Sequence, residues 1–366
     1  MNKDPFQEYI KQSEPDKRDK GYAWHTAIGL QAVDGLKPSE YLIHTAIQNI
    51  EGKISIDEAQ RLLNSYYEEN SEADGDRTEE ADKVSVQIAK ILSEKAFSFT
   101  PNEYISIHKK LFTGIYKHAG EIRDYNITKK EWVLNGATVL YGSASELRAT
   151  LEYDFSEEKK FSYKSLSMDE IIRHLALFVS RLWQIHIFGE GNTRTTAVFF
   201  IKYLRTLGFD ATNDVFAEHA WYFKNALVRA NYNDLKNGVH ATTEYLELFL
   251  RNLLLDEKNE LHNRAMHISG AFQLDKKADI EGQKADIREK IEACLPDLSE
   301  KTIRHILLMY EKYGNENIFG RSDVEELTVL KSTRVSELMN MLLNAGIIQA
   351  TKGHGKGKYC FHDPKK

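Results

Sequence analysis

The sequence predicts a mainly α-helical protein that ends in a small α+β domain. Only 6 of the 366 residues are prolines, and segments with apolar residues at helical spacing recur from residue 21 to about residue 265. Past residue 297 the pattern changes to three helical segments followed by two strand-like segments around the tip "TKGHGKGK". Helix, helix, helix and hairpin is the order of a winged helix.

The expected domain boundaries follow these changes of pattern. We expect a helical N-terminal domain over residues 1–70, a larger helical core over 71–265, a charged helical connector over 266–296 and a winged-helix domain over 297–366. The acidic segment "EENSEADGDRTEEAD" before the core is interpreted as an exposed connection, because a solvated charge run is the usual case.

The composition excludes some classes of protein. The chain is 42% hydrophobic and 28% charged, with a net charge of -6, which argues against a protein coated in nucleic acid but allows one basic patch. The polar start resembles no signal peptide, and no apolar run is long enough to cross a membrane. Cys294 and Cys360 form no motif, so a reduced cytoplasm is expected.

The stretch "QIHIFGEGNTRTTAVFF", residues 184–200, places several chemically active side chains between two apolar helices. The second helix begins here, and its free N–H groups and dipole favour a phosphate. Gly191 lets the backbone approach a ligand, Asn192 can donate from its amide, and Arg194 can bind phosphate oxygens as a fork.

Two further side chains of this stretch indicate the type of reaction. Glu190 would repel a phosphate unless a hard cation such as Mg²⁺ bridged them. His186 can accept a proton from an incoming hydroxyl, and Phe188 is expected to face the core. Together they favour phosphoryl or nucleotidyl transfer from a Mg²⁺-bound nucleotide. The alternative interpretation is a helix–helix loop without catalytic function, with a buried histidine and a surface Glu–Arg pair. It accounts well for any one of these residues, but less well for all of them together.

The stretch resembles the signature of the Fic family, His-x-Phe-x-(Asp/Glu)-Gly-Asn-Gly-Arg-x-x-Arg. The matching residues are His186, Phe188, Glu190, Gly191, Asn192 and Arg194. "IHKKLF", "AGEIR" and the predicted hairpin that follows extend the similarity over about residues 83–265. The resemblance implies a Fic-type helical bundle with a β-hairpin flap. It also implies transfer of AMP from ATP, with Mg²⁺, to a Ser, Thr or Tyr hydroxyl of a target protein.

The resemblance also implies a role for each residue. His186 would be the base, Glu190 would hold Mg²⁺, and Arg194 would bind the β-phosphate. The anion hole would be formed by Asn192 with the loop amides, that is, by Gly189, Gly191, Asn192 and Thr193. Residues 127–141 would be the flap that aligns the target backbone as an added strand. Its expected docking residues are Ile127, Thr128, Val139 and Leu140.

Two positions depart from the family pattern. Thr193 stands where the family usually has Gly, and Ala197 stands where it has a second Arg. In the family that Arg grips the γ-phosphate and pairs with an inhibitory Glu. A different donor nucleotide, a different transferred group and weak activity are therefore open alternatives.

Two segments resemble the inhibitory motif Ser/Thr-x-x-x-Glu-Gly/Asn of the family. "LQAVDGLKP" is similar to VbhA-type antitoxins in pattern and spacing, with Asp34 at the Glu position and Gly35 matching. "SYYEEN" fits the short motif through Ser65 and Glu69, but such a match is common in an acidic helix end. We favour the first. Because Asp is short and Ala197 replaces its expected partner, we expect this segment to inhibit by packing more than by a salt bridge.

The predicted winged helix offers a second class of function, DNA binding. Its third helix carries Lys331, Ser332 and Arg334 near the start, where a recognition helix meets bases, and Lys356 lies in the basic wing tip. A protein–protein module is an equally weighted interpretation. For the whole chain, the alternative is a DNA-binding regulator with a weak or inactive Fic core, although His186 and Glu190 argue against it. The target protein and the oligomeric state, including a homodimer, stay open.

Overall fold

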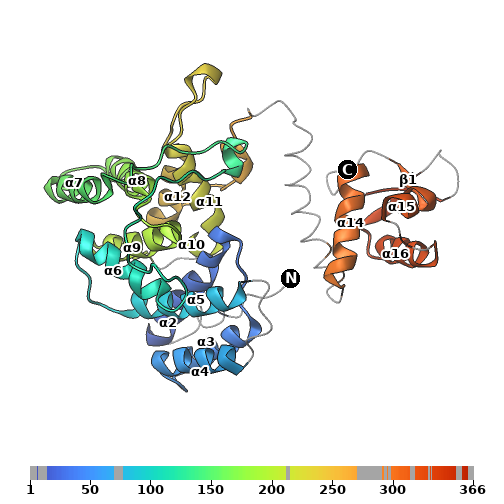
Figure 1. The fold of residues 1–366 in the computed structure, drawn as a ribbon, viewed down its shortest axis with the longest axis horizontal. Coiled ribbons are helices and arrows are strands. Elements are labelled where there is room, and N and C mark those ends of the chain that lie inside the picture. The colour runs from blue at the N-terminus through green and yellow to red at the C-terminus, as the bar shows by residue number, and fades with distance from the viewer. Residues whose placement is uncertain are drawn as a thin grey trace. The chain divides into compact units, whose positions relative to one another are not determined.

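A computed structural model describes residues 6, 15–69, 77–211, 215–269, 291, 295, 298–313, 318–328, 330, 332–351 and 357–361. The chain forms two compact units (Figure 1). One covers residues 4–271, and the other covers residues 272–366 with the first three residues. Each unit is described by itself.

The first unit begins with helices that contain clear local stop and start signals. These are α2 (Pro15–Gly29), the 3-10 helix η1 (Leu30–Asp34), α3 (Glu40–Ile50), α4 (Ile56–Glu69) and α5 (Thr78–Ser93). Gly35 ends η1 in the left-handed conformation, with φ 68°. Ser39 caps α3 by accepting a hydrogen bond from Leu42 N.

The remaining elements of this unit follow in chain order. They are α6 (Pro101–Phe112), η2 (Trp132–Leu134), α7 (Leu147–Lys160), α8 (Met168–Ile185), α9 (Asn192–Thr206), α10 (Val215–Glu218), α11 (Ala220–Ala230), η3 (Leu235–Asn237), α12 (Glu244–Leu255) and η4 (Asn263–Met266). The sequence pattern favours α8 as the central helix, but every residue from Asn192 to Leu204 of α9 is buried, whereas α8 exposes one face. The loop at the start of α9 is therefore anchored in the middle of the unit.

One hydrophobic core runs through the first unit. It joins Trp24 and Leu42 from the N-terminal helices to Phe199 and Leu250 from α9 and α12. Because all these helices bury apolar side chains in the same cluster, residues 15–69 share the core of the unit and do not form a separate one.

The acidic segment at residues 68–82 is not solvated throughout, contrary to the sequence-based interpretation. Its last turn belongs to α5, where Glu80 and Asp82 are buried. Asp82 accepts hydrogen bonds from Ser39 N at 2.8 Å and from Tyr67 OH at 2.7 Å. These bonds compensate for the burial of the charge, which charge patterning alone does not reveal.

Residues 127–141, all of which the structure describes, do not form the expected pair of β-strands. The tip is formed by η2, and backbone pairing is confined to bonds such as Glu131 N to Ala137 O at 3.0 Å. Val133, Leu134 and Val139 are buried in the unit's core. The two arms pack their side chains on the core instead of pairing along their length, so the expected strand ladder does not form.

The second unit has its own small core around Phe319, Val335 and Phe361. Its elements are α14 (Glu300–Tyr313), β1 (Phe319–Gly320), α15 (Arg321–Thr328), α16 (Ser332–Asn344), β2 (Ile348–Ala350) and β3 (Lys358–Phe361). The antiparallel sheet has the order β1-β3-β2. The sequence did not predict β1, and the winged-helix assignment stays a prediction. A search of the described residues finds no helix that could span a membrane.

Candidate active site

The loop between α8 and α9 has a shape that two left-handed residues determine. His186, with φ 49°, closes α8, and its N–H donates to Trp183 O at 3.1 Å. Gly191, with φ 73°, starts α9, and a Cβ there would lie 2.4 Å from the ring of Phe112. Gly191 is thus required by the protein's own packing as well as by its backbone conformation.

Asn192 and Thr193 hold this loop with their side chains. The amide of Asn192 accepts from Phe188 N at 3.0 Å and donates to Phe188 O at 2.7 Å. The hydroxyl of Thr193 accepts from the indole N–H of Trp183 at 3.0 Å. Phe188 is fully buried, as expected. The loop is therefore organised before any ligand binds, and Thr193 contributes a contact that Gly at this position would lack.

His108 on α6 holds the same loop by a hydrogen bond to its backbone. Its Nδ1 accepts from Gly120 N at 2.8 Å, so its Nε2 carries the proton and donates to Glu190 O at 3.1 Å. The ring stacks on Phe188 with centroids 3.7 Å apart. Burial lowers the pKa of His108 to about 3, which keeps this ring neutral. The quoted segment "IHKKLF" contains His108, but sequence reasoning gave it no role.

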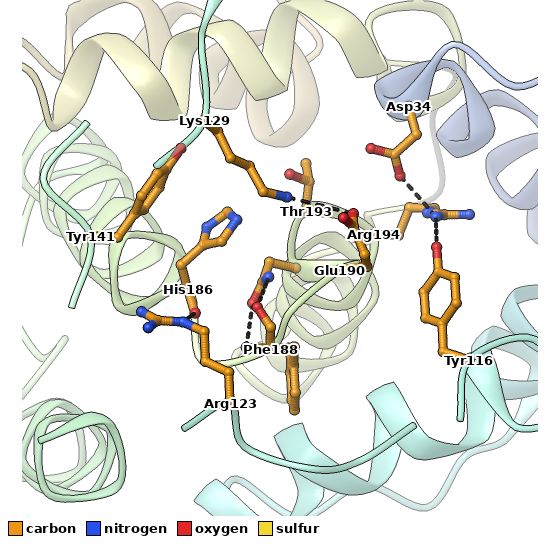
Figure 2. Close-up of polar contacts among 12 residues, drawn as sticks. Asp34, Tyr116, Arg123, Lys129, Tyr141, His186, Phe188, Glu190, Thr193 and Arg194 are labelled. Carbon is orange, nitrogen blue, oxygen red and sulfur yellow. Dashed lines mark hydrogen bonds and ion pairs between the residues drawn. The ribbon is translucent and has the colours of Figure 1, made fainter. Parts of the chain in front are cut away.

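Arg123, from the segment "AGEIR", binds the backbone on the other side. Its Nε donates to His186 O at 2.7 Å, its Nη2 donates to Gly142 O at 2.6 Å, and its backbone N–H donates to Ile187 O at 3.0 Å. Figure 2 shows the Arg123 side chain directly beside His186. One buried guanidinium therefore fixes both the histidine and the end of the flap segment.

His186 has the properties of a base. The ring is buried, its Nδ1 lies 3.3 Å from Trp183 O, and its Nε2 has no partner among the described residues. With the proton on Nδ1, Nε2 presents a lone pair. Burial, followed by the charge of Lys129, holds the pKa of His186 well below its ordinary value. The imidazole is thus neutral at neutral pH, with Nε2 unprotonated.

Glu190 is the one acid of the loop, and its side chain is 56% exposed. Its Oε2 lies 3.6 Å from Nζ of Lys129. Within the part of the chain that the structure describes, no three His, Cys, Asp or Glu residues gather as a metal site. A single exposed carboxylate suits Mg²⁺ only when substrate phosphates and water supply the other ligands.

Arg194, in contrast, is fully buried and heavily bonded (Figure 2). The following oxygen atoms accept its hydrogen bonds or ion pairs: Glu80 Oε1 at 2.7 Å, Asp34 Oδ2 at 2.8 Å, Gln31 Oε1 at 3.0 Å and Tyr116 OH at 3.2 Å. Its guanidinium also lies over Phe112, 4.9 Å from the ring centroid. Burial opposes the charge, but these partners outweigh it and raise the pKa of Arg194.

Asp34 forms a salt bridge in the structure, although Ala197 replaces its expected partner. The carboxylate pairs with Arg194, the first arginine position of the signature, and not with position 197, where Ala197 is buried. Gly35 ends η1 beside it. The short Asp reaches its partner because η1 packs directly on α9.

Glu80 and Tyr116 are site residues that the sequence did not predict. Glu80 accepts from Tyr116 OH at 2.6 Å and from Arg77 at 2.7 Å, in addition to its pair with Arg194. Burial alone would raise the pKa of Glu80, but these donors outweigh it and lower the pKa. Nothing in the local acidic pattern distinguishes Glu80 from its solvated neighbours.

The other predicted residues lie in varied surroundings. On the flap segment Val139 is buried, Ile127 is half-buried, Thr128 is exposed and Leu140 is 85% exposed. Ser65 and Glu69 lie exposed on α4. Gly189 lies in the loop, where a Cβ would lie 2.7 Å from Tyr125 OH. Ser332 and Arg334 are exposed at the start of α16, where Arg334 pairs with Glu337 at 2.8 Å. Lys331 and Lys356 lie outside the described residues.

Among the comparisons with known proteins, a family model covers the loop. No curated protein matches the sequence. A Fic family protein from Desulfovibrio desulfuricans G20 is 12% identical in its crystal structure, with a TM-score of 0.45 over 95% of this chain and 88% of that chain. Residues 98–204 match the Fic/DOC family model and include α6 to α9 with the loop between α8 and α9. Residues 98–204 are a Fic/DOC domain.

Proposed function

We propose that this chain is a protein adenylyltransferase that the segment around Asp34 inhibits. It transfers AMP from Mg²⁺-ATP to a Ser, Thr or Tyr hydroxyl of a target protein. The observation that carries the proposal is the buried Nε2 of His186, which lacks a partner in the described structure. The Fic/DOC domain supports it, because this family often carries AMPylation or a related nucleotidyl transfer.

The geometry of the loop supports the following course of the transfer. The target hydroxyl donates to Nε2 of His186, and its oxygen attacks the α-phosphorus. As the new P–O bond forms, the proton moves to Nε2, the bond to the bridging oxygen breaks, and pyrophosphate leaves. The backbone N–H groups at the start of α9 stabilise the developing negative charge. Glu190 would hold Mg²⁺, which neutralises the charge of the phosphates.

We propose that inhibition acts on Arg194, the residue expected to bind phosphate. In the described state the guanidinium of Arg194 is bonded to Asp34, Glu80 and Gln31. A phosphate that needs Arg194 must displace at least one of these oxygen atoms. Asp34 lies on the short helix η1 and is partly exposed, so it is the partner that a local movement can release.

Transfer of label from α-labelled ATP with Mg²⁺ into protein tests the proposal. The full chain should label weakly, Asp34→Ala should label more strongly, and Asp34→Ala combined with His186→Ala should not label. Point variants suit this test better than deletion of residues 1–60, because the deleted helices share the core of the unit.

The same panel with labelled GTP, CTP and UTP tests the donor. Thr193 and Ala197 depart from the family pattern at the nucleotide side of the loop. Label from another nucleotide alone would keep the transfer and replace ATP as the donor. No label from any nucleotide in the Asp34→Ala protein would overturn the proposed function.

A further inference from the structure

Two basic side chains near the loop differ in their availability to a ligand. Arg194 is fully buried and pairs with two carboxylates. Lys129 keeps 33% of its side chain exposed, and its Nζ lies 3.6 Å from one oxygen of Glu190. An arriving phosphate can therefore reach the ammonium of Lys129 without breaking a buried ion pair.

The flap segment fixes the position of Lys129. Its backbone N–H donates to the hydroxyl of Thr138 on the opposite arm at 3.1 Å. Glu131, two residues on, is buried and lies 3.4 Å from Lys224. Lys130 between them is exposed. Because extended backbone alternates its side chains, residues 129 and 131 face inward and residue 130 faces outward.

The charge of Lys129 also reaches the base. Figure 2 shows its side chain extending from the flap segment toward Glu190, with His186 nearby. After burial, Lys129 is the main cause of the lowered pKa of His186, and Arg123 and Lys224 add to it. Tyr141, whose hydroxyl donates to Glu131, covers the imidazole with centroids 4.3 Å apart. Lys129 thus contacts the acid that would hold the metal, and its charge acts on His186.

We propose that Lys129 is a phosphate-binding residue that pairs with Glu190 in the nucleotide-free protein and moves to the nucleotide's phosphates when Mg²⁺ binds that carboxylate. An ammonium and Mg²⁺ repel each other at one carboxylate, whereas a polyphosphate offers acceptors to both. The lysine's flexible stem and three donors suit this exchange. The inference rests on the proposed function for its nucleotide.

Calorimetric titration of the full chain tests this exchange. The probes are ATP and inorganic triphosphate, each with Mg²⁺, and the proteins are the native chain and Asp34→Ala. In both, Lys129→Gln should weaken binding about tenfold, which corresponds to the loss of one charge-assisted hydrogen bond. Lys129→Arg should recover most of the affinity. Lys130→Gln, which removes a neighbouring outward charge, should bind like its parent.

Each other outcome has a definite meaning. Equal affinity of Lys129→Gln and its parent, in protein with an unchanged melting temperature, would overturn the inference. Tighter binding would also overturn it, because Lys129 would then only compete with the metal. If triphosphate binds and depends on Lys129 while ATP does not bind, the donor in the proposed function is wrong and the inference holds. No binding of either probe to any form would overturn both.

Discussion

The two ends of the α8–α9 loop differ sharply in how their polar atoms are satisfied. At the His186 end, Nε2 is buried with no partner among the described residues, and the charges of Lys129, Arg123 and Lys224 help to lower the pKa of the ring. At the Arg194 end, the guanidinium is bonded to three side-chain oxygens of other helices besides the hydroxyl of Tyr116. The nitrogen of His186 is thus unbonded, whereas the guanidinium of Arg194 is already occupied by groups of the protein itself. The proposed inhibition would therefore act on nucleotide binding and leave His186 unchanged.

Removal of the base should produce the largest effect. In the Asp34→Ala background, His186→Ala should reduce the labelling rate by about 10²- to 10⁴-fold, because no other group accepts the proton. Calorimetry should show nearly unchanged ATP affinity. An equal loss of binding and labelling would mean that His186 organises the loop and is not the base.

Glu80 should matter more for stability than for chemistry. Glu80→Gln removes a buried charge that Arg194, Arg77 and Tyr116 all contact, and it should lower the free energy of unfolding by about 3 kcal/mol. Chemical denaturation measures the free energy of unfolding. As a control, Glu79→Gln, which removes a surface ion pair with Lys83, should lower that free energy by less than about 1 kcal/mol. Equal costs would contradict the buried network.

The effect of Glu80 should also depend on pH. Its pKa is lowered in the folded protein, so its contribution is complete above the unfolded value of about 4.3 and is lost as the pH falls through the lower folded value. The stability difference between native protein and Glu80→Gln should therefore be full at neutral pH and shrink in acid. If the stability difference between the two proteins stayed constant until the protein unfolded in acid, the charge of Glu80 would not be its source.

Release of the inhibitory contact should have a smaller but clear effect. Asp34→Ala removes one charge-assisted bond and leaves Arg194 paired with Glu80, so labelling should rise about 10- to 100-fold without loss of the fold. Glu69→Ala, in the second candidate segment, should leave labelling unchanged because Glu69 is exposed on α4. If Glu69→Ala released as much label as Asp34→Ala, the assignment of the inhibitory segment would fail.

Thr193 should give the smallest effect. Thr193→Ala removes the hydroxyl that accepts from Trp183 and should cost about 1 kcal/mol in unfolding measurements, while Thr193→Ser should retain the bond. Labelling should change little in either variant. If Thr193→Ala instead lost much of its labelling at unchanged stability, the hydroxyl of Thr193 would have to contact the bound nucleotide.

The sequence predicted the local parts of this site well. Helical periodicity predicted an apolar helix on each side of the stretch 184–200, where α8 and α9 lie, and the spacing from His186 to Arg194 drew attention to the loop between them. The helical periodicity and the spacing both involve residues that are close together in the sequence. Residues whose role depends on such local geometry can be recognised without a structure.

The residues that the sequence missed act over long separations. Glu80 and Arg194 lie 114 positions apart, and His108 reaches Glu190 across 82 positions. A run of acids also gives no sign of which carboxylate is buried, so Glu80 was assigned to a solvated segment. The flap strands were predicted from β-forming residues, but packing of the arms on the core overrode that preference.

The shared core of the first unit has a consequence for how the protein responds to its own abundance. Because the segment with Asp34 belongs to the same folded body as Arg194, its effective concentration at the site is fixed by the chain itself. Dilution, low expression or loss of a separate partner cannot remove it. Under the proposed inhibition, activation would require a change that shifts η1, so the activity would respond to a signal and not to gene dosage.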